Sequence, residues 1–247
     1  MIADPVEEQI SIYAKLLKLP TFAKYTEILR KADQSADFGT LLLELMKNEY
    51  LKRKENQNNR RLKQAGFPFL KSIDELDLTR YDGNLSQIIV QELASCQYIA
   101  DRKNVILFGN TGRGKTHMAI GLGVKACAQG MSVIFENASS LSTKLAEAMD
   151  NYMLGKLEKR LQNTDLLILD EMGYVHFDRK QSELLFRTIA KRSELGSIIV
   201  TSNLPFSDWT NLFDSAALVA AMVDRLTFKS FIIDMNGESY RLEKTRK

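Results

Sequence analysis

The pattern of apolar and polar positions changes at about residue 100. Beyond it, short apolar runs rich in β-branched residues alternate with stretches of helical periodicity. The runs occupy residues 104–108, 132–136, 166–170, 197–201 and 230–234. Such alternation is typical of α/β domains in which helices flank a parallel sheet. The sequence therefore predicts a doubly wound α/β domain with a five-stranded, mainly parallel sheet.

Before residue 100 the pattern is helical and predicts no parallel strand. Apolar residues fall at helical spacing on both sides of Pro20, which separates two predicted helices within residues 5–31. A third helix is expected to begin at Asp37 or Thr40, either of which can cap it. Its first half is apolar and its second half strongly polar. We therefore expect a small N-terminal helical domain.

Composition narrows the class of protein. The chain has 247 residues, of which 45% are hydrophobic and 26% charged, as in ordinary globular proteins and unlike disordered ones. We expect a helical domain at 1–65 and the α/β domain at 66–247. Two cysteines, Cys96 and Cys127, are too few for a disulfide scaffold and fit a reducing cytoplasm. The first residues are acidic, so we expect no signal peptide. The sequence has no apolar run of ~18 residues, so we expect no membrane partner.

A glycine-rich segment joins the first predicted strand to a helical run at 115–128. Residues 109–116 read GNTGRGKT, the GxxxxGK[ST] pattern of a phosphate-binding loop in its required strand–helix context. In such a loop, backbone N–H groups surround the phosphates, the Lys reaches the β/γ-phosphates and the Thr hydroxyl binds Mg²⁺. A glycine-rich turn that matches by accident is the alternative, which this context disfavours. The predicted nucleotide-binding residues are Gly109, Asn110, Thr111, Gly112, Arg113, Gly114, Lys115, Thr116 and His117.

Polar residues follow the third and fourth predicted strands. Asp170 ends the strand at 166–170 beside the phosphate loop, where it can hold Mg²⁺ with Thr116, partly through water. Glu171 comes next and is placed to polarise an attacking water. A capping pair after a buried strand is the alternative, which the upstream phosphate loop disfavours. Asn203 either contacts the γ-phosphate or water, or belongs to a turn before a proline, and spacing alone does not decide.

Longer blocks carry a family resemblance. They are RRLKQAGFP (60–68), LDLTR (76–80), GKTHMA (114–119), LLILDEMGY (166–174), IIVTSNLPFSDW (198–209), VDRL (223–226) and GESYRL (237–242). In this order they resemble the AAA+ ATPases in the clade of bacterial replication initiators and helicase loaders. The similarity is greatest to the IstB-like family, the ATP-dependent helper proteins of insertion-sequence transposases, with the DnaC helicase loader as a near relative.

The resemblance implies ATP and Mg²⁺ as cofactors, and roles for further residues. Asn203 would be the sensor of the γ-phosphate, and Arg225 the arginine finger inserted into a neighbouring subunit's site. Arg241 would be the second sensor, acting in its own subunit. With Glu171, these are the predicted catalytic residues. From the residues alone, Arg225 can instead pair with a surface carboxylate, and Arg241 can be a solvated tail residue.

The phosphate loop also departs from the family pattern. Asn110 and Arg113 stand where small or apolar residues are usual. We expect Arg113 to place a cation beside the phosphates and so to change nucleotide affinity or turnover. Ser193 replaces an aromatic residue usual in the family, without removing a catalytic group.

Basic residues are concentrated at two places. Residues 47–71 have a net charge of +6, although the whole chain has only +3. Such a stripe suits contact with a DNA backbone, although a solvated helix face or a protein-docking surface is also possible. Residues 139–163 are long enough for more than one helix and match a helical insertion that lines the nucleic-acid path in the resembling clade, with a solvated face as the alternative. The DNA-binding candidates are Lys52, Arg53, Lys54, Arg60, Arg61, Lys63, Lys156, Lys159 and Arg160.

Three functions are compatible with these features. The favoured one is an ATP-dependent helper that oligomerises on duplex DNA, deforms it, recruits and stimulates a transposase, and disassembles on hydrolysis. The alternative is a DnaC-like replicative helicase loader that grips single strands. A nucleotide-gated scaffold without turnover is disfavoured by the intact pair Asp170 and Glu171. The expected partners are therefore double-stranded DNA, a transposase and further copies of the chain, in the bacterial cytoplasm.

Overall fold

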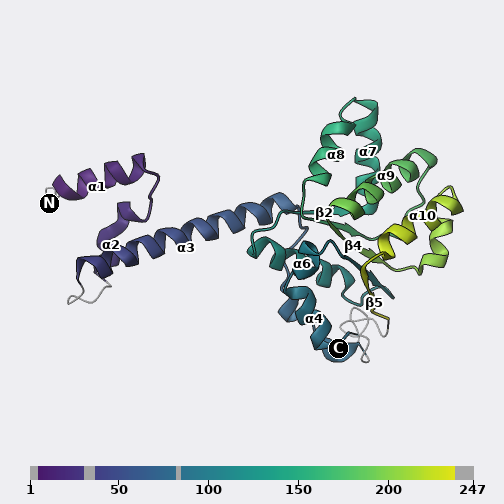
Figure 1. Cartoon of the computed structure of the whole chain (residues 1–247), viewed down its shortest axis with the longest axis horizontal. Coiled ribbons are helices and arrows are strands. Elements are labelled where there is room, and N and C mark those ends of the chain that lie inside the picture. Colours follow the sequence, from purple (N-terminus) through teal and green to yellow (C-terminus); the bar gives the residue numbers. More distant parts are fainter. Residues whose placement is uncertain (1–4, 31–36, 82–84, 237–247) are drawn as a thin grey trace. The chain divides into compact units, whose positions relative to one another are not determined.

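The chain consists of two units, Met1–Arg60 and Arg61–Lys247. The computed structural model describes residues 5–30, 37–81 and 85–236 (Figure 1). The first unit is helical throughout its described part. Its elements are α1 (Pro5–Leu16), a 3-10 helix (Phe22–Lys24), α2 (Tyr25–Leu29) and most of α3 (Phe38–Ala65).

Side-chain hydrogen bonds fix the turns of the first unit. Asp37 caps α3, because its Oδ1 accepts the N–H of Thr40 at 2.7 Å, so the earlier of the two predicted starts is correct. The Glu49 carboxylate is 4% exposed and accepts the Thr21 N–H at 3.0 Å and Arg53 Nε at 2.7 Å. These bonds tie the segment after α1 to the middle of α3.

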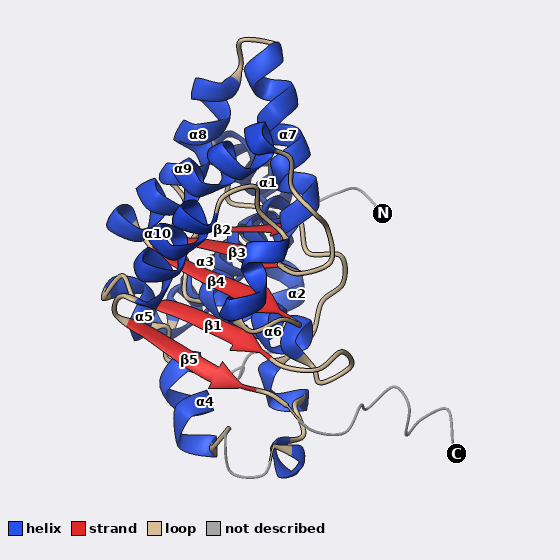
Figure 2. Cartoon of the chain, turned by 90° about the vertical axis from the view of Figure 1, so that its right-hand side faces the viewer, coloured by secondary structure: helices blue, strands red, loops and turns tan. Residues whose placement is uncertain are grey.

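The second unit is built on one parallel sheet, as the sequence predicts. Figure 2 shows its strands side by side in the order β2-β3-β4-β1-β5. The predicted second strand is displaced by one residue, because the Ser132 N–H and hydroxyl both donate to Asp165 and hold Ser132 in the preceding loop. The strands are β1 (Asn104–Phe108), β2 (Val133–Asn137), β3 (Leu166–Asp170), β4 (Ser197–Ser202) and β5 (Ser230–Asp234).

Both faces of the sheet are buried under helices. On one face, Val105, Leu107 and Ile168 pack with α4 and α6. On the other face, alternate residues such as Ile106 and Leu167 pack with α7, α9 and α10. The sheet is therefore sandwiched between two helical layers. The helices are α4 (Gln87–Ala94), α5 (Gln97–Ala100), α6 (Lys115–Ala128), α7 (Ala138–Asp150), α8 (Leu154–Gln162), α9 (Arg179–Leu195) and α10 (Ala216–Thr227).

One buried cation fixes the loops that lead into β3 and β4. Arg192, on α9, has no exposed surface, and burial lowers its pKa to about 10. A Cβ at Gly196 would stand 2.5 Å from the Arg192 guanidinium, so a larger residue there would displace the guanidinium. The guanidinium donates to the carbonyl oxygens of Gln162, Thr164, Asp165 and Ser197.

The cysteines lie in the core of the second unit. Both thiols are free, and burial raises the pKa of Cys127 to about 11, so that thiol stays protonated at neutral pH. Among the helices of the described segments, none is both long and apolar enough to cross a bilayer.

Candidate functional site

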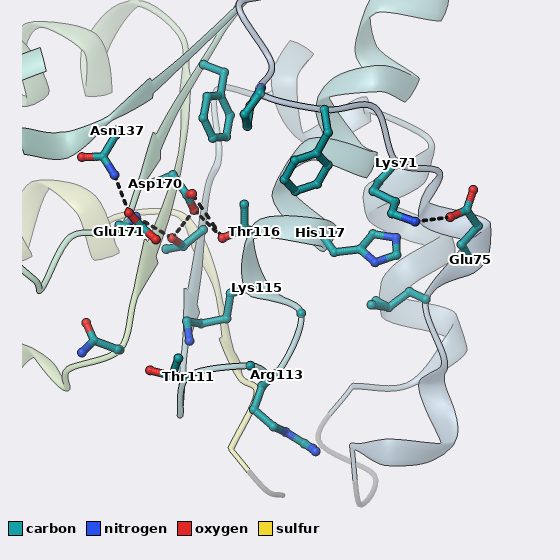
Figure 3. Close-up of a pocket in the computed structure, with 18 of the residues that line it drawn as sticks. Lys71, Glu75, Thr111, Arg113, Lys115, Thr116, His117, Asn137, Asp170 and Glu171 are labelled. Atoms are coloured by element: carbon teal, nitrogen blue, oxygen red, sulfur yellow. Dashed lines mark hydrogen bonds and ion pairs between the residues drawn. The ribbon is translucent and has the colours of Figure 1, made fainter. Parts of the chain in front are cut away.

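The carboxyl edge of the sheet opens into a cavity of about 880 Å³ (Figure 3). The loop between β1 and α6 forms one wall, and the ends of β2, β3 and β4 form another. The segment around residues 68–81 closes a third side. Parallel sheets bind ligands at this edge, because the loops that carry polar groups converge there. The motifs found separately in the sequence therefore meet in one site.

The phosphate loop depends on two of its glycines. Gly109 has φ +141°, and a Cβ there would stand 2.7 Å from the Met235 backbone. Gly114 has φ +82°, and a Cβ would stand 2.9 Å from the Tyr81 hydroxyl. The Lys115 ammonium donates to the carbonyl oxygens of Gly109 at 2.6 Å and Asn110 at 2.8 Å. The loop therefore curls around the lysine that the sequence assigns to the β/γ-phosphates.

The side chain of Arg113 is held by contacts outside the phosphate loop. It is 5% exposed and donates from Nε to the Met235 carbonyl and from Nη2 to the Asn236 carbonyl, both at 3.1 Å. Its guanidinium also lies 5.0 Å from the centre of the Tyr81 ring, and the Tyr81 hydroxyl donates to the Arg113 carbonyl at 2.7 Å. Figure 3 shows Arg113 pointing away from Lys115. The arginine thus ties the loop to the two residues that follow β5 and also lines the cavity, while its effect on nucleotide affinity or turnover remains a prediction.

Asp170 lies between two hydroxyl groups. Thr116 Oγ1 donates to its two carboxylate oxygens at 2.9 and 3.1 Å, and Thr201 Oγ1 donates to Oδ1 at 2.6 Å. Burial raises the pKa of Asp170 above its ordinary value, and the two hydroxyl donors oppose that rise. The structure therefore brings together Thr116 and Asp170, the two residues predicted to hold Mg²⁺. Their oxygen atoms are the hard ligands that Mg²⁺ prefers.

Glu171 is held in an unusual backbone conformation. Its φ is +60°, which costs a non-glycine residue on the order of 1 kcal/mol. Its N–H donates to Thr201 Oγ1 at 2.9 Å, and its Oε2 accepts Asn137 Nδ2 at 2.6 Å. Thr201 and Asn137 were not among the predicted site residues. Both lie at the carboxyl ends of strands, so a search of every strand end for polar side chains would have found them.

Asn203 lines the cavity beside the turn that follows β3. Its Oδ1 is buried and lacks a hydrogen-bond partner among the described residues. A Cβ at Gly173 would stand 2.2 Å from that oxygen, so the turn packs closely against the Asn203 amide. The asparagine is therefore placed in the cavity, while its role as the sensor of the γ-phosphate remains a prediction.

Two further predicted residues have contacts outside the phosphate loop. His117 lines the cavity, and its Nε2 is 2.8 Å from the Ser72 carbonyl oxygen. Arg225, on α10, donates to the Ala221 carbonyl at 3.1 Å and lies 5.2 Å from the centre of the Phe186 ring. It is not among the residues that line the cavity of its own chain, and its action in a neighbour remains a prediction. Arg241 lies outside the described residues.

The predicted DNA contacts on α3 fall into two groups. Three cations are engaged: Lys52 pairs with Glu55, Arg53 bonds Glu49 and the Lys18 carbonyl, and half-buried Arg61 lies beside Gly130. The other three are exposed, and no ion pair is found for them within the described residues. They are Lys54, Arg60 and Lys63.

The cations on α8 share an exposed surface. The neighbouring Glu158 is 8% exposed and pairs with Arg187 and Lys191 on α9, so this acid faces the fold. The insertion at 139–163 thus forms two helices, as expected, with its free positive charge in solvent. The exposed cations are Lys156, Lys159 and Arg160.

The known proteins that are similar to this chain include ATP-binding proteins of insertion sequences. The family described as IstB-like ATP-binding proteins matches residues 12–247. The chain is 35% identical over 241 residues to the ATP-binding protein of insertion sequence IS21 from Pseudomonas aeruginosa, covering 97% of this chain and 91% of that one. It is 32% identical over 246 residues to its counterpart from IS5376 of Geobacillus stearothermophilus, with coverages of 98% and 96%. The structure of the DnaC helicase loader is similar in fold, with a TM-score of 0.54 and 20% identity over 74% of this chain and 98% of that one.

Proposed function

The chain belongs to the family of IstB-like ATP-binding proteins, and from this premise we propose that it is an ATPase that assembles on duplex DNA and assists a transposase. The observation that carries the proposal is the group formed by Thr116, Asp170 and Glu171 at the mouth of the phosphate loop. A nucleotide-binding scaffold needs the loop alone. Hydrolysis also requires a carboxylate that can act on water, and Glu171 provides one directly after the aspartate proposed to bind the metal.

The phosphate loop and its surroundings account for ATP binding. Backbone N–H groups of residues 109–116 would surround the phosphates, with the Lys115 ammonium at the β/γ end. Thr116 and Asp170 would hold Mg²⁺, with water and phosphate oxygens as the other ligands. The ion supplies neutralisation of the phosphate charge as the γ-phosphoryl group is transferred.

The residues beside the loop account for hydrolysis. Glu171 orients a water molecule and accepts its proton as the water oxygen bonds to the γ-phosphorus and the bond to ADP breaks. Asn137 holds the Glu171 carboxylate, and Asn203 would contact the γ-phosphate or the water. Arg225 of a neighbouring copy would stabilise the charge that develops, and Arg241 would act within its own subunit. Hydrolysis would then depend on oligomerisation.

The free cations account for DNA binding without strong sequence preference. Phosphate contacts from Lys54, Arg60 and Lys63 on α3, and from the exposed basic side chains of α8, would release counterions. The slope of log affinity against log salt should fall in magnitude by about 0.9 for each contact removed. Lys54→Ala should show this change, whereas Lys52→Ala, which removes a lysine already paired with Glu55, should show less.

The ATPase proposal is tested by steady-state hydrolysis and nucleotide binding. Lys115→Ala should abolish nucleotide binding, with Lys125→Ala as the control, because Lys125 lies on the same helix and pairs with Asp74. Glu171→Gln should bind ATP and stop turnover, which traps the ATP-bound assembly. Arg225→Ala should reduce turnover and leave the affinity of an isolated subunit unchanged. Continued hydrolysis by Glu171→Gln would exclude Glu171 as the base.

The DNA proposal is tested by binding to duplex and single strands with ATP, ADP or no nucleotide, together with particle imaging. We expect ATP-dependent assemblies on duplex DNA. Preference for single strands, without assemblies on duplex, would instead support the helicase-loader alternative, which the fold similarity to DnaC keeps open. Stimulation of a transposase encoded beside the gene tests the final part of the proposal.

A further inference from the structure

The turn that leaves β3 is attached to the rest of the site at both of its ends. At its start, the Glu171 N–H donates to Thr201 Oγ1 at 2.9 Å, and the Met172 N–H donates to the Thr201 carbonyl at 2.8 Å. At its end, the Tyr174 hydroxyl is 2.9 Å from Thr111 Oγ1, and either oxygen can be the donor. The turn that carries the proposed general base is therefore joined to β4 on one side and to the phosphate loop on the other.

The middle of this turn is formed by Gly173. Gly173 has φ +151°, a conformation that side chains other than glycine rarely adopt. Its backbone packs against the Asn203 amide, whose Oδ1 has no partner among the described residues. Beyond this packing, the backbone of the turn is attached to Thr201 on one side and the Tyr174 hydroxyl to Thr111 on the other. The Tyr174–Thr111 contact is the attachment on the side of the loop.

The Tyr174–Thr111 contact lies near Lys115, the residue assigned to the β/γ-phosphates. Thr111 follows Asn110, whose carbonyl oxygen accepts the Lys115 ammonium at 2.8 Å. Figure 3 shows Thr111 beside the end of the Lys115 side chain. Tyr174 and Thr111 both line the cavity, together with Glu171. The Tyr174 hydroxyl thus contacts Thr111, the residue next to Asn110. The Asn110 carbonyl in turn binds Lys115, which is predicted to contact the reacting phosphates.

We propose that Tyr174 is a positioning residue for ATP hydrolysis, whose hydroxyl ties the Glu171 turn to Thr111 and so sets the distance between the general base and the γ-phosphate. The inference rests on the ATPase function proposed above. Packing of the ring does not explain this residue, because the Tyr174 side chain is 53% exposed. The hydroxyl is the part of Tyr174 that contacts Thr111, and Tyr174→Phe removes only that group.

The effect is expected in the rate of the chemical step. Loss of one exposed hydrogen bond has little effect on nucleotide affinity, because the loop N–H groups and Lys115 still bind the phosphates. A displacement of the base by about 1 Å can reduce the rate by about 100-fold. We therefore expect Tyr174→Phe to reduce kcat by about 10-fold or more, and to change KM for ATP and Kd for ADP by less than about 3-fold.

A double-mutant cycle separates this role from a general disturbance. Tyr174→Phe, Thr111→Val and the double variant should have similar kcat, because each lacks the same hydrogen bond. Thr111→Ser keeps a hydroxyl and should recover most of the activity lost in Thr111→Val. Tyr152→Phe is the matched control, because Tyr152 is 96% exposed on the turn between α7 and α8 and does not line the cavity. It should leave kcat unchanged.

Hydrogen exchange gives a measurement that does not require turnover. In Tyr174→Phe and in Thr111→Val, the peptide that covers residues 171–176 should exchange faster than in the wild type, while peptides from the sheet should not change. Wild-type kcat in Tyr174→Phe would overturn the inference, and so would losses that multiply in the double variant or unchanged exchange in this peptide. Absence of hydrolysis in the wild type would refute the proposed ATPase instead, and the exchange experiment would still test the attachment.

Discussion

The hydroxyl of Thr201 serves both acidic residues of the site, so its removal tests how the site is built. Thr201 is 1% exposed, donates to Asp170 Oδ1 at 2.6 Å and accepts the Glu171 N–H at 2.9 Å. Thr201→Val keeps the shape of the side chain and removes both bonds. We expect lower stability and a further rise in the pKa of Asp170, because a hydrogen bond that favours its charged form is lost.

The magnitude follows from the two bonds. A hydrogen bond to a charged group contributes about 1.5–3 kcal/mol to the free energy of unfolding. The bond from the Glu171 N–H is part-buried and joins two neutral groups, so its loss costs about 0.5–1 kcal/mol. The sum of about 2–4 kcal/mol corresponds to a decrease in the urea midpoint of roughly 1–2 M for a slope of about 2 kcal/mol per M.

The pH dependence has a definite sign. Burial raises the folded pKa of Asp170 above its ordinary value of 3.8, and Thr201→Val raises it further. A group with a raised folded pKa contributes its full stability below its unfolded pKa. That stability is lost as pH rises through the folded pKa, and Thr201→Val loses more of it than the wild type does. The difference in the free energy of unfolding between the wild type and Thr201→Val should therefore have its full size at neutral pH. It should shrink as pH falls through the two folded pKa values, because a protonated Asp170 depends less on the Thr201 hydroxyl.

The assay is urea unfolding of the full chain at a series of pH values, without nucleotide or metal. Thr201→Ser, which keeps the hydroxyl, should retain most of the pH-dependent part of the stability. Thr188→Val is the matched control, since Thr188 is also buried but donates to the Leu184 carbonyl, so its loss should not depend on pH. Equal losses in Thr201→Ser and Thr201→Val, or a loss independent of pH, would refute this account.

Three further substitutions give expected outcomes. Asp170→Asn should abolish ATP hydrolysis. It should also raise the thermal midpoint above that of the wild type at pH 7 but not near pH 4, because it removes a buried charge. A lower midpoint at pH 7 would contradict this. Gly173→Ala should reduce kcat and lower stability by about 1–3 kcal/mol, because the added Cβ meets Asn203 Oδ1 at 2.2 Å; kinetics and urea unfolding measure both. Arg192→Leu should lower the free energy of unfolding by about 3–5 kcal/mol, because it leaves four carbonyl acceptors without their donor; a loss below about 1 kcal/mol in urea unfolding would show that water replaces the guanidinium.

The sheet was predictable because its strands are buried on both faces. A strand such as β3, LLILD, has no polar face, so it appears in the sequence as a continuous apolar run between turns. The residue that ends such a run, Asp170, is then fixed at the carboxyl edge. The same logic placed Thr116, because the phosphate-loop motif specifies both the strand before it and the helix after it.

The rest of the site was not predictable, because it depends on contacts between elements far apart in the sequence. Asn137 reaches Glu171 only because β2 pairs with β3, with Asn137 opposite Asp170. The contacts of the Arg113 side chain were missed for a similar reason. Position in the motif indicated a charge beside the phosphates, but the end of β5 offers it two carbonyl acceptors. A local pattern specifies where a backbone goes, and longer-range contacts decide where a long side chain points.

Unfavourable features collect at the carboxyl edge of the sheet, and this pattern supports its assignment as the functional site. Asp170 is a buried carboxylate with a raised pKa, Glu171 has a left-handed backbone, and Asn203 has a buried oxygen without a partner in the described part of the chain. A fold selected for stability alone would remove each of them with one substitution. Each would have a use in the proposed ATP hydrolysis, as a metal ligand, a base and a sensor, and each would gain partners when ATP and Mg²⁺ bind. Nucleotide binding should therefore stabilise this edge more than the helical layers, and hydrogen exchange of residues 166–176 and 197–203 with and without nucleotide would measure the difference.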